Sequence, residues 1–145
     1  MKALAEAMSA LVHVLSQREA GVDPVGRVLA VNVVHDPVLE AWRERLTLVH
    51  WNRGAAQALE ESGFKVNREE AVSNGRYAEV WLLPDRQREC QLGDMARAWD
   101  QVEEGGRLVV SVRNDWGAKR LEEQWKDVVG GGLVSHSKHH CRVFI

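Results

Sequence analysis

The chain has few cysteines, and their placement excludes several classes of protein. Only two occur in 145 residues: Cys90 in a predicted helix and Cys141 in a predicted strand, with no redox motif around either. We therefore expect reduced thiols rather than a disulfide framework. A chain of this length can bury a core large enough to fold without disulfides or a structural metal. One domain is expected, with an N-terminal helix in residues 1–22 and an α/β core in residues 27–145.

Long apolar runs and a strong net charge are also missing. No stretch is long and apolar enough to span a membrane. The first residues are similar to the start of a signal peptide, but His13, Arg18 and Glu19 interrupt the apolar core that such a peptide requires, so we expect a cytoplasmic protein. A formal net charge of -2 argues against a protein that holds nucleic acid by charge alone. This net charge is nevertheless compatible with a local basic patch.

What the sequence does contain is a series of apolar runs that predict buried strands. The runs do not alternate with polar residues, which is typical of strands covered by helices on both faces of a parallel sheet. They lie at 27–34, 46–51, 64–66, 80–83 and 108–112. With helices between them, they predict a doubly wound, mostly parallel α/β sheet of the Rossmann-like kind. Two final strands, 133–136 and 139–145, joined by Ser137 and Lys138, are expected to form an antiparallel edge.

Helical patterns separate these strands. An amphipathic pattern covers 3–20, Asp36 and Pro37 are typical of a helix start, and a further helix is predicted over 53–61. The last helix is expected to end at Gly130. The predicted buried faces of the last two helices consist of Leu92, Met95, Ala96, Trp99 and Val102, and of Ala118, Leu121, Trp125 and Val128.

Function is expected where the central strands end, because open α/β sheets bind ligands at the carboxyl ends of their strands. Those ends are residues 83–86 and 113–116. Most tryptophans fall at core-facing positions and are explained by packing. Trp116 differs, because it lies at a helix start at the expected functional end, where it could stack on a ligand or contact another domain.

Basic residues near these strand ends form two groups that could contact RNA phosphates, although a solvated surface explains either group alone. The acidic pairs of the chain would confine any RNA contact to one face. The residues of the two groups are Arg113, Lys119 and Arg120, and Lys138, His139, His140 and Arg142.

The order of motifs in the second half of the chain resembles a known family. The motifs are a strand with a Leu-Pro ending at 77–85, Gly-Gly-Arg-Leu-Val-Val at 105–110, a helix entry at 114–120, and Ser-Lys-His-His-Cys-Arg-Val at 137–143. Their spacing resembles the N-terminal half of the bidomain small-subunit rRNA guanine-N2-methyltransferases. In that family two class I methyltransferase-like domains arose by duplication, and only the C-terminal copy keeps the active site.

The resemblance also shows what the site lacks. An active copy has a glycine-rich turn after the first strand, an acidic residue after the second, and Asn-Pro-Pro-aromatic at the end of the strand that here covers 80–83. At those places this chain has no glycine, no acid and no catalytic amide. The degenerate positions are Val34, His35, Asp36, Asn52, Pro84 and Asp85. The resemblance therefore implies no catalytic residue and no cofactor bound by this domain, with S-adenosylmethionine used by the parent enzyme.

The function that the resemblance implies is an accessory domain that packs on a catalytic C-terminal domain and helps to position small-subunit rRNA. The chain ends at Ile145 directly after a predicted strand, as one domain of a longer protein would. One alternative is an active S-adenosylmethionine-dependent methyltransferase with an atypical cofactor loop, in which Asp36 or Asp85 substitutes for the missing residues. Another alternative is a stand-alone binding module.

Metal and nucleophile chemistry are weaker interpretations. His136, His139, His140 and Cys141 carry ligand types that zinc prefers, but neighbours in a strand point to opposite faces and no second pair at ligand spacing accompanies them. No metal site is therefore expected. Neither cysteine has the surroundings of a catalytic thiol.

Overall fold

A computed structural model describes residues 2–17, 26–34, 36–42, 46–49, 59–61, 63–64, 66–67, 77–84, 86–130, 133–138 and 140–145. The elements in chain order are α1 (Lys2–Ser16), β1 (Val28–Val31), α2 (Val38–Trp42), β2 (Leu46–Val49), β3 (Val66–Asn67), β4 (Tyr77–Leu82), α4 (Arg88–Trp99), β5 (Val102–Arg113), the 3-10 turn η2 (Asn114–Trp116), α5 (Ala118–Val129), β6 (Ser135–Lys138) and β7 (Cys141–Phe144).

The strands form one seven-stranded sheet in the order β3-β2-β1-β4-β5-β7-β6. The first five strands in this order are parallel, and β7 pairs antiparallel with both β5 and β6. The predicted fold class, a doubly wound and mostly parallel sheet with an antiparallel edge, is confirmed. Because β1 is buried at all four positions, its apolar run without alternation reflects a strand covered on both faces.

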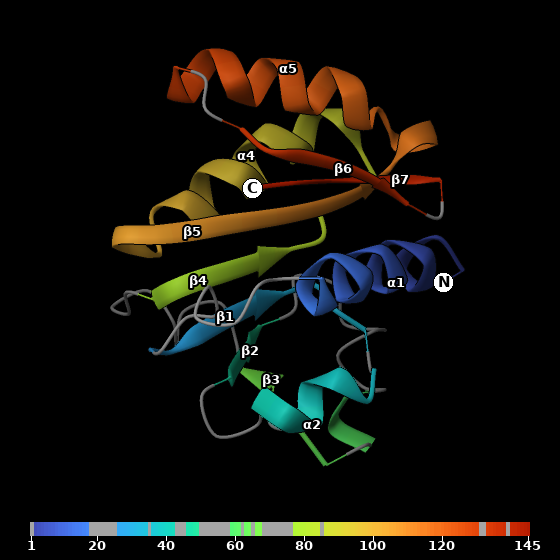
Figure 1. The fold of residues 1–145 in the computed structure, drawn as a ribbon, viewed down its shortest axis with the longest axis vertical. Helices are drawn as coiled ribbons and strands as arrows, with labels where there is room; N and C mark the ends of the chain where they lie inside the picture. Colours follow the sequence, from blue (N-terminus) through green and yellow to red (C-terminus); the bar gives the residue numbers. More distant parts are fainter. Residues whose placement is uncertain are drawn as a thin grey trace.

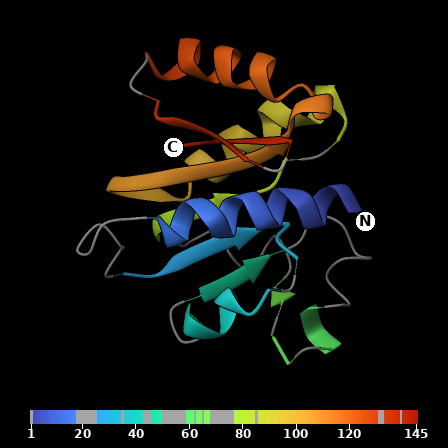
Figure 2. The ribbon, with the colours of Figure 1, turned by 45° about the vertical axis from the view of Figure 1, so that its right-hand side comes forward.

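Helices cover both faces of this sheet (Figures 1 and 2). On one face, α1 and α2 pack against the sheet through Met8, Leu11 and Leu39, which share a cluster with Trp81 and Val143. The other face carries α4 and α5 over a second cluster. The α1 helix lies over β5 and β7, where Ser111 Oγ donates to the carbonyl of Ala7 at 2.7 Å. This bond fixes a helix from the start of the chain on strands from its end.

The predicted N-terminal helix is confirmed as far as Ser16, and the predicted continuation to residues 20 or 22 lies mostly outside the described residues. Met8, Leu11 and Leu15 form its buried face. The predicted helix over 53–61 also lies mostly outside the described residues.

The predicted buried face of α4 is confirmed for Met95 and wrong for its other members on the helix. Leu92 is 38% and Trp99 47% exposed, Ala96 is exposed, and Val102 belongs to β5. Beside Met95, the helix buries Gln91, Asp94 and Ala98. The periodicity of apolar residues could not show this, because a polar residue, Gln91, takes a core position through hydrogen bonds to another element. In α5 the prediction holds for Ala118, Leu121 and Trp125 but is wrong for Val128, which is 67% exposed.

The C-terminal hairpin differs from the prediction in its turn. The turn falls between Lys138 and Cys141 rather than at Ser137 and Lys138, and His140 takes a positive φ of 61° within it. Phe144 is buried against α5, although its neighbour Val143 is buried on the opposite face of the sheet. The reason is that β7 lies between the two helical layers, so that both of its faces are covered.

The strand β5 begins at Val102, six residues before its predicted start. Its register against β4 shifts between Tyr77 and Glu79, and Gly105 and Gly106 lie in this irregular part. A Cβ at Gly106 would lie 2.7 Å from the carbonyl oxygen of Ala78 and 2.8 Å from Cγ1 of Val102. Only glycine fits here without movement of the backbone of β4.

Gly106→Ala is therefore expected to lower the free energy of unfolding by about 1–3 kcal/mol, the range for overpacking at a tight position. Gly93→Ala is the control, because nothing lies within 4 Å of its built Cβ in the middle of α4. That change should raise stability by about 0.5–1 kcal/mol, since alanine favours helix over glycine. Chemical denaturation of the three proteins measures both effects, and equal stabilities of the two variants would refute the packing argument.

No helix among the described residues is long and apolar enough to cross a membrane. Both cysteines are free thiols, Cys90 exposed and Cys141 buried. Burial raises the pKa of Cys141 to about 11, which keeps this thiol neutral at physiological pH.

Candidate functional site at the carboxyl ends of the strands

The ends of β1, β2 and β4 are tied together by one residue, Asn32. Its backbone lies in the left-handed region with φ 62°, and its N–H donates to the carbonyl of Val49 at 3.0 Å. Its side-chain Nδ2 donates to the carbonyl of Leu83 at 3.2 Å. The N–H of Leu83 in turn donates to the carbonyl of Val31 at 3.1 Å. With 7% of its surface exposed, Asn32 fills the space between the first and fourth strands where they end.

The residues that follow these two strands turn into the core. Val33 is fully buried and Leu83 is 1% exposed, and both belong to the cluster under α1 and α2. Of the predicted degenerate positions, Val34 is half-buried and Pro84 is buried. Asp36 is half-buried, and its carbonyl accepts the N–H of Leu39 at the start of α2 at 3.0 Å. His35, Asn52 and Asp85 lie outside the described residues.

At the end of β5, Arg113 holds two carboxylates. Its Nε and Nη2 donate to Asp115 at 2.7 and 2.9 Å, and its Nη1 donates to Glu6 of α1 at 2.7 Å. The hydrogen bond from Arg113 lowers the pKa of Asp115, and the same bond raises the pKa of Arg113. The folded-state pKa of Asp115 lies below its ordinary value of 3.8. The ion pair therefore stabilises the folded protein fully at neutral pH, and this stabilisation is lost only when acid protonates Asp115. Arg113 thus joins α1 to the strand end.

A second polar group holds Trp116 beside this strand end. Gln91 of α4 is fully buried, donates from Nε2 to the carbonyl of Trp116 at 2.9 Å, and accepts from Nη2 of Arg120 at 3.0 Å. Gly117 has φ 84°, and a Cβ there would lie 2.9 Å from the guanidinium of Arg120. Trp116 is half-buried and packs against both hydrophobic clusters, so only part of its ring could meet a ligand or another domain.

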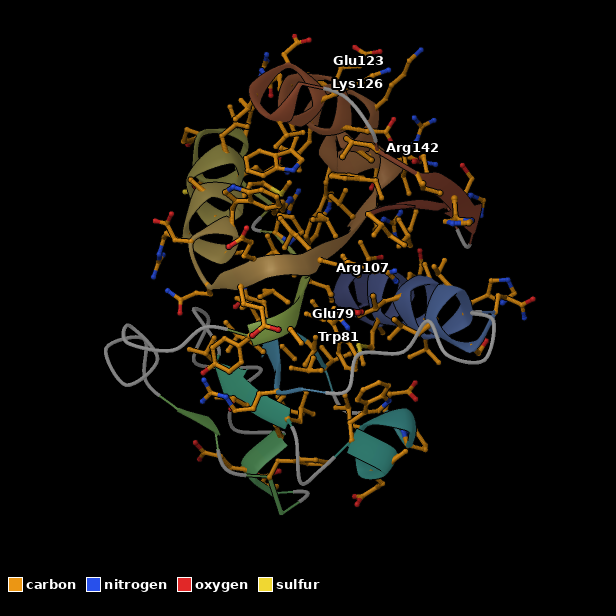
Figure 3. All side chains as sticks on the ribbon, turned by 60° about the vertical axis from the view of Figure 1, so that its left-hand side comes forward. Glu79, Trp81, Arg107, Glu123, Lys126 and Arg142 are labelled. Atoms are coloured by element: carbon orange, nitrogen blue, oxygen red, sulfur yellow. The ribbon has the colours of Figure 1, made fainter. Side chains whose placement is uncertain are left out.

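The two predicted basic groups are brought to the same end of the sheet. Arg113 is paired with Cys141 across β5 and β7, and the N–H of Asn114 donates to the carbonyl of His140 at 2.9 Å. Not all of these basic side chains are free to contact phosphate, however. Arg142 lies under α5, where it contacts Glu122 at 3.3 Å (Figure 3).

The exposed members of the basic groups are Lys119, at the start of α5, and His140. His139 and the side chain of Lys138 lie outside what the structure describes. Across the described residues, no group of three or more His, Cys, Asp or Glu side chains could hold a metal ion.

Sequence reasoning missed Asn32 and Gln91. A signal for Asn32 was present, since asparagine is among the few residues that adopt positive φ readily and it follows an apolar run. For Gln91 there was none, because its partners come from a turn and a helix 25 and 29 residues away.

Comparison with protein-family models gives no match, and neither does comparison with curated proteins. Solved structures do match. The 16S rRNA N2 G1207 methyltransferase RsmC of T. thermophilus, in complex with AdoMet and guanosine, matches with a TM-score of 0.69 at 17% identity, over 99% of this chain and 38% of that chain. A methyltransferase from Pyrococcus furiosus matches with a TM-score of 0.62 at 12% identity, over 95% of this chain and 80% of that chain.

An O-methyltransferase family protein from Burkholderia thailandensis matches with a TM-score of 0.58 at 14% identity, over 94% of this chain and 54% of that chain. This chain thus spans 38% of the T. thermophilus enzyme and about half of the Burkholderia protein. At these identities the similarity shows the fold, which is that of class I S-adenosylmethionine-dependent methyltransferases.

Proposed function

We propose that this chain is a methyltransferase-like accessory domain without catalytic activity of its own, part of an rRNA guanine-N2-methyltransferase. In this proposal it supports a catalytic domain C-terminal to it and helps to position small-subunit rRNA in the cytoplasm. The observation that carries the proposal is the end of β4. Leu83 places a buried apolar side chain where an active copy has its catalytic amide, and its carbonyl already accepts a hydrogen bond from Asn32 at 3.2 Å.

The residues at these strand ends do not fit S-adenosylmethionine. A class I site needs a turn after β1 whose backbone a ligand can approach closely, and glycine is what allows that approach. Here the turn begins with Asn32, whose side chain closes on β4, and continues with Val33, which is fully buried. We therefore assign the cofactor to the catalytic domain and derive no chemical step on this chain.

Two observations support the choice of an rRNA guanine-N2-methyltransferase among the methyltransferase folds. The motifs in the second half of the chain resemble the N-terminal copy of that family. The T. thermophilus rRNA N2 G1207 methyltransferase matches this chain over 99% of its residues and is more than twice as long as the matched part. Both agree with a chain that accounts for one domain of a larger enzyme.

The surface proposed for rRNA lies at the end of β5 and the start of α5. Arg113 is held by Glu6 and Asp115, and Arg142 by Glu122, so these two arginines are less available to phosphate than their positions in the sequence suggest. Lys119 and His140 are exposed, and their neighbours Lys138 and His139 complete the proposed group. Contact with a few phosphates agrees with the net charge of -2.

A gel-shift titration with small-subunit rRNA fragments at several salt concentrations tests the RNA role. Lys119→Gln should weaken binding and reduce the slope of log K against log salt by about 1, the effect of losing one phosphate contact. Lys126→Gln is the matched control, since both lysines are exposed on α5 and lie seven residues apart, so that they point the same way but only Lys119 is at the site. Figure 3 shows Lys126 on α5.

Equal effects of the two substitutions would exclude this surface. Absence of binding at physiological salt, both for this chain alone and for the chain joined to its catalytic domain, would exclude the RNA role altogether. The chain would then be a stand-alone binding module or a purely structural domain.

A further inference from the structure

The outermost strand of the sheet, β6, has one open edge. It is the last strand in the sheet order, and β7 lies on its inner side. Val134 and Ile145, which flank the two strands, exchange two backbone hydrogen bonds at 2.9 and 3.2 Å. Backbone groups alternate in direction along a strand, so His136 also faces β7. Ser135 and Ser137 therefore direct their N–H and C=O groups outward, where the described part of the chain places no strand.

The side chains of β6 are polar and able to donate hydrogen bonds. The strand has the sequence Ser-His-Ser-Lys, and Ser135, His136 and Ser137 are all exposed. The two serines lie on the α5 face of the sheet, since Ser135 is paired with Phe144 of the cluster under α4 and α5. No residue of the strand is acidic, so nothing on the strand itself repels an anion.

This edge has the features that prevent pairing with another protein strand. It has only four residues, none of its side chains is apolar, and it ends in a lysine. Short length and charged side chains are the means by which natural sheets avoid the addition of a further strand. A peptide added here would also find no pockets for its side chains along β6. The edge is better suited to a ligand that brings its own hydrogen-bonding groups and needs no apolar pocket.

The backbone of RNA has such groups. Proteins contact phosphate oxygens through lysine and arginine, through hydroxyl side chains and through backbone N–H groups. On β6 the outward N–H groups and the hydroxyls belong to residues two apart, a repeat of about 7 Å along the edge. The outward carbonyls of Ser135 and Ser137 need donors instead, and the 2′-hydroxyl of RNA is one that DNA lacks.

The edge also continues the surface proposed above for rRNA, because Lys138 ends β6 and His139 and His140 follow it. We infer that the outer edge of β6 binds the sugar-phosphate backbone of a single-stranded RNA segment. The N–H groups and hydroxyls of Ser135 and Ser137 contact phosphates, and their carbonyls accept from 2′-hydroxyls. A single strand can follow this edge, since base pairing does not fix its backbone. This inference rests on the proposed rRNA role and adds uncharged contacts to it.

A single-stranded uridine hexanucleotide and the same oligonucleotide with deoxyribose are the probes, added to the 145-residue chain. Hydrogen exchange of the backbone amides is followed by nitrogen-proton correlation spectra. The RNA should slow the exchange of Ser135 and Ser137 by about fivefold or more. The amide of His136 is the internal control, since it already faces β7 and should change little. The deoxyribose probe should bind several-fold more weakly, because it has no 2′-hydroxyls.

Two substitutions of one serine separate its backbone from its side chain. Ser137→Ala removes the hydroxyl and should weaken RNA binding by about threefold. Ser137→Pro also removes the outward N–H and should weaken binding by about tenfold. An edge strand tolerates proline where the N–H faces away from the sheet, and thermal unfolding of both variants checks that the fold is kept.

The outcomes distinguish this inference from the rRNA role on which it rests. If the RNA binds and Lys119→Gln weakens it, but the amides of Ser135 and Ser137 stay unprotected, the edge of β6 is not the site. Equal binding of the alanine and proline variants, or of the two oligonucleotides, would also overturn the inference. If neither oligonucleotide binds, the rRNA role fails together with it. Protection that rises with protein concentration and without RNA would mean that a second copy occupies the edge, and the inference would be wrong.

Discussion

Trp81→Ala is expected to lower the free energy of unfolding by about 3–5 kcal/mol, the range for truncating a large buried aromatic side chain. Trp81 is fully buried near the end of β4, and its ring meets that of Trp42 edge to face at a centroid distance of 5.3 Å. Its indole Nε1 donates to Oε1 of Glu79 at 2.8 Å, and Glu79 is only 1% exposed (Figure 3). The substitution therefore leaves a cavity in the α1 and α2 layer and takes a donor from a buried carboxylate.

Denaturant titration measures this loss, and thermal unfolding should show it as a midpoint lowered by about 10 °C or more. Trp99→Ala is the control, because the same side chain is removed where it is 47% exposed, and its cost should stay near 1 kcal/mol. Trp81→Phe keeps a large aromatic ring but loses the hydrogen-bond donor to Glu79. Its loss of unfolding free energy should fall between those of Trp81→Ala and Trp99→Ala. A Trp81→Ala protein as stable as the Trp99→Ala protein would show that the core of β4 is misassigned.

Asn32→Ala is expected to cost about 2–4 kcal/mol, from two separate causes. Alanine is disfavoured at the observed φ of 62°, and the buried carbonyl of Leu83 loses the Nδ2 donor. Asn32→Gly separates the two causes, since glycine accepts this φ and loses only the hydrogen bond, so that it should cost about 1–2 kcal/mol less than alanine.

Asn32→Asp gives a third outcome for the same position. The carboxylate is close in size to the amide, but its oxygens can only accept hydrogen bonds. It would therefore face the carbonyl oxygen of Leu83, which is also an acceptor, without a proton between them. It should therefore be less stable than Asn32→Gly at neutral pH. A glycine variant as stable as the wild-type protein would mean that the side chain of Asn32 does not hold the two strand ends together.

Fold class was predictable because the apolar runs are short, buried on both faces and separated by helical patterns. Val80 and Val109 lie in the short runs 80–83 and 108–112 and are fully buried, so the local pattern is enough to predict these strands. The antiparallel edge also followed from the last two runs. Strand starts were less predictable, because the six-residue extension of β5 depends on Gly105 and Gly106, whose conformation is set by pairing with β4.

The candidate site was predictable in place but not in detail. The sequence shows which strand ends meet and that glycine, an acid and an amide are missing there. It does not show that Asn32 bridges to Leu83, that Gln91 is buried beneath Trp116, or that Arg113 is held by Glu6 from α1. Each of these contacts joins residues far apart in the chain, and only the packing of two layers onto the sheet brings them together.

The central claim is that the strand ends of this domain are closed to S-adenosylmethionine, and calorimetric titration tests it most directly. The titrant is S-adenosylmethionine, and a methyltransferase that binds it serves as the positive control under the same buffer and salt. The account predicts no saturable heat of binding up to millimolar S-adenosylmethionine. Any binding free energy would then be weaker than about -4 kcal/mol, the value for a Kd of 1 mM. Saturable binding in the micromolar range would contradict the account and support an active methyltransferase with an atypical cofactor loop.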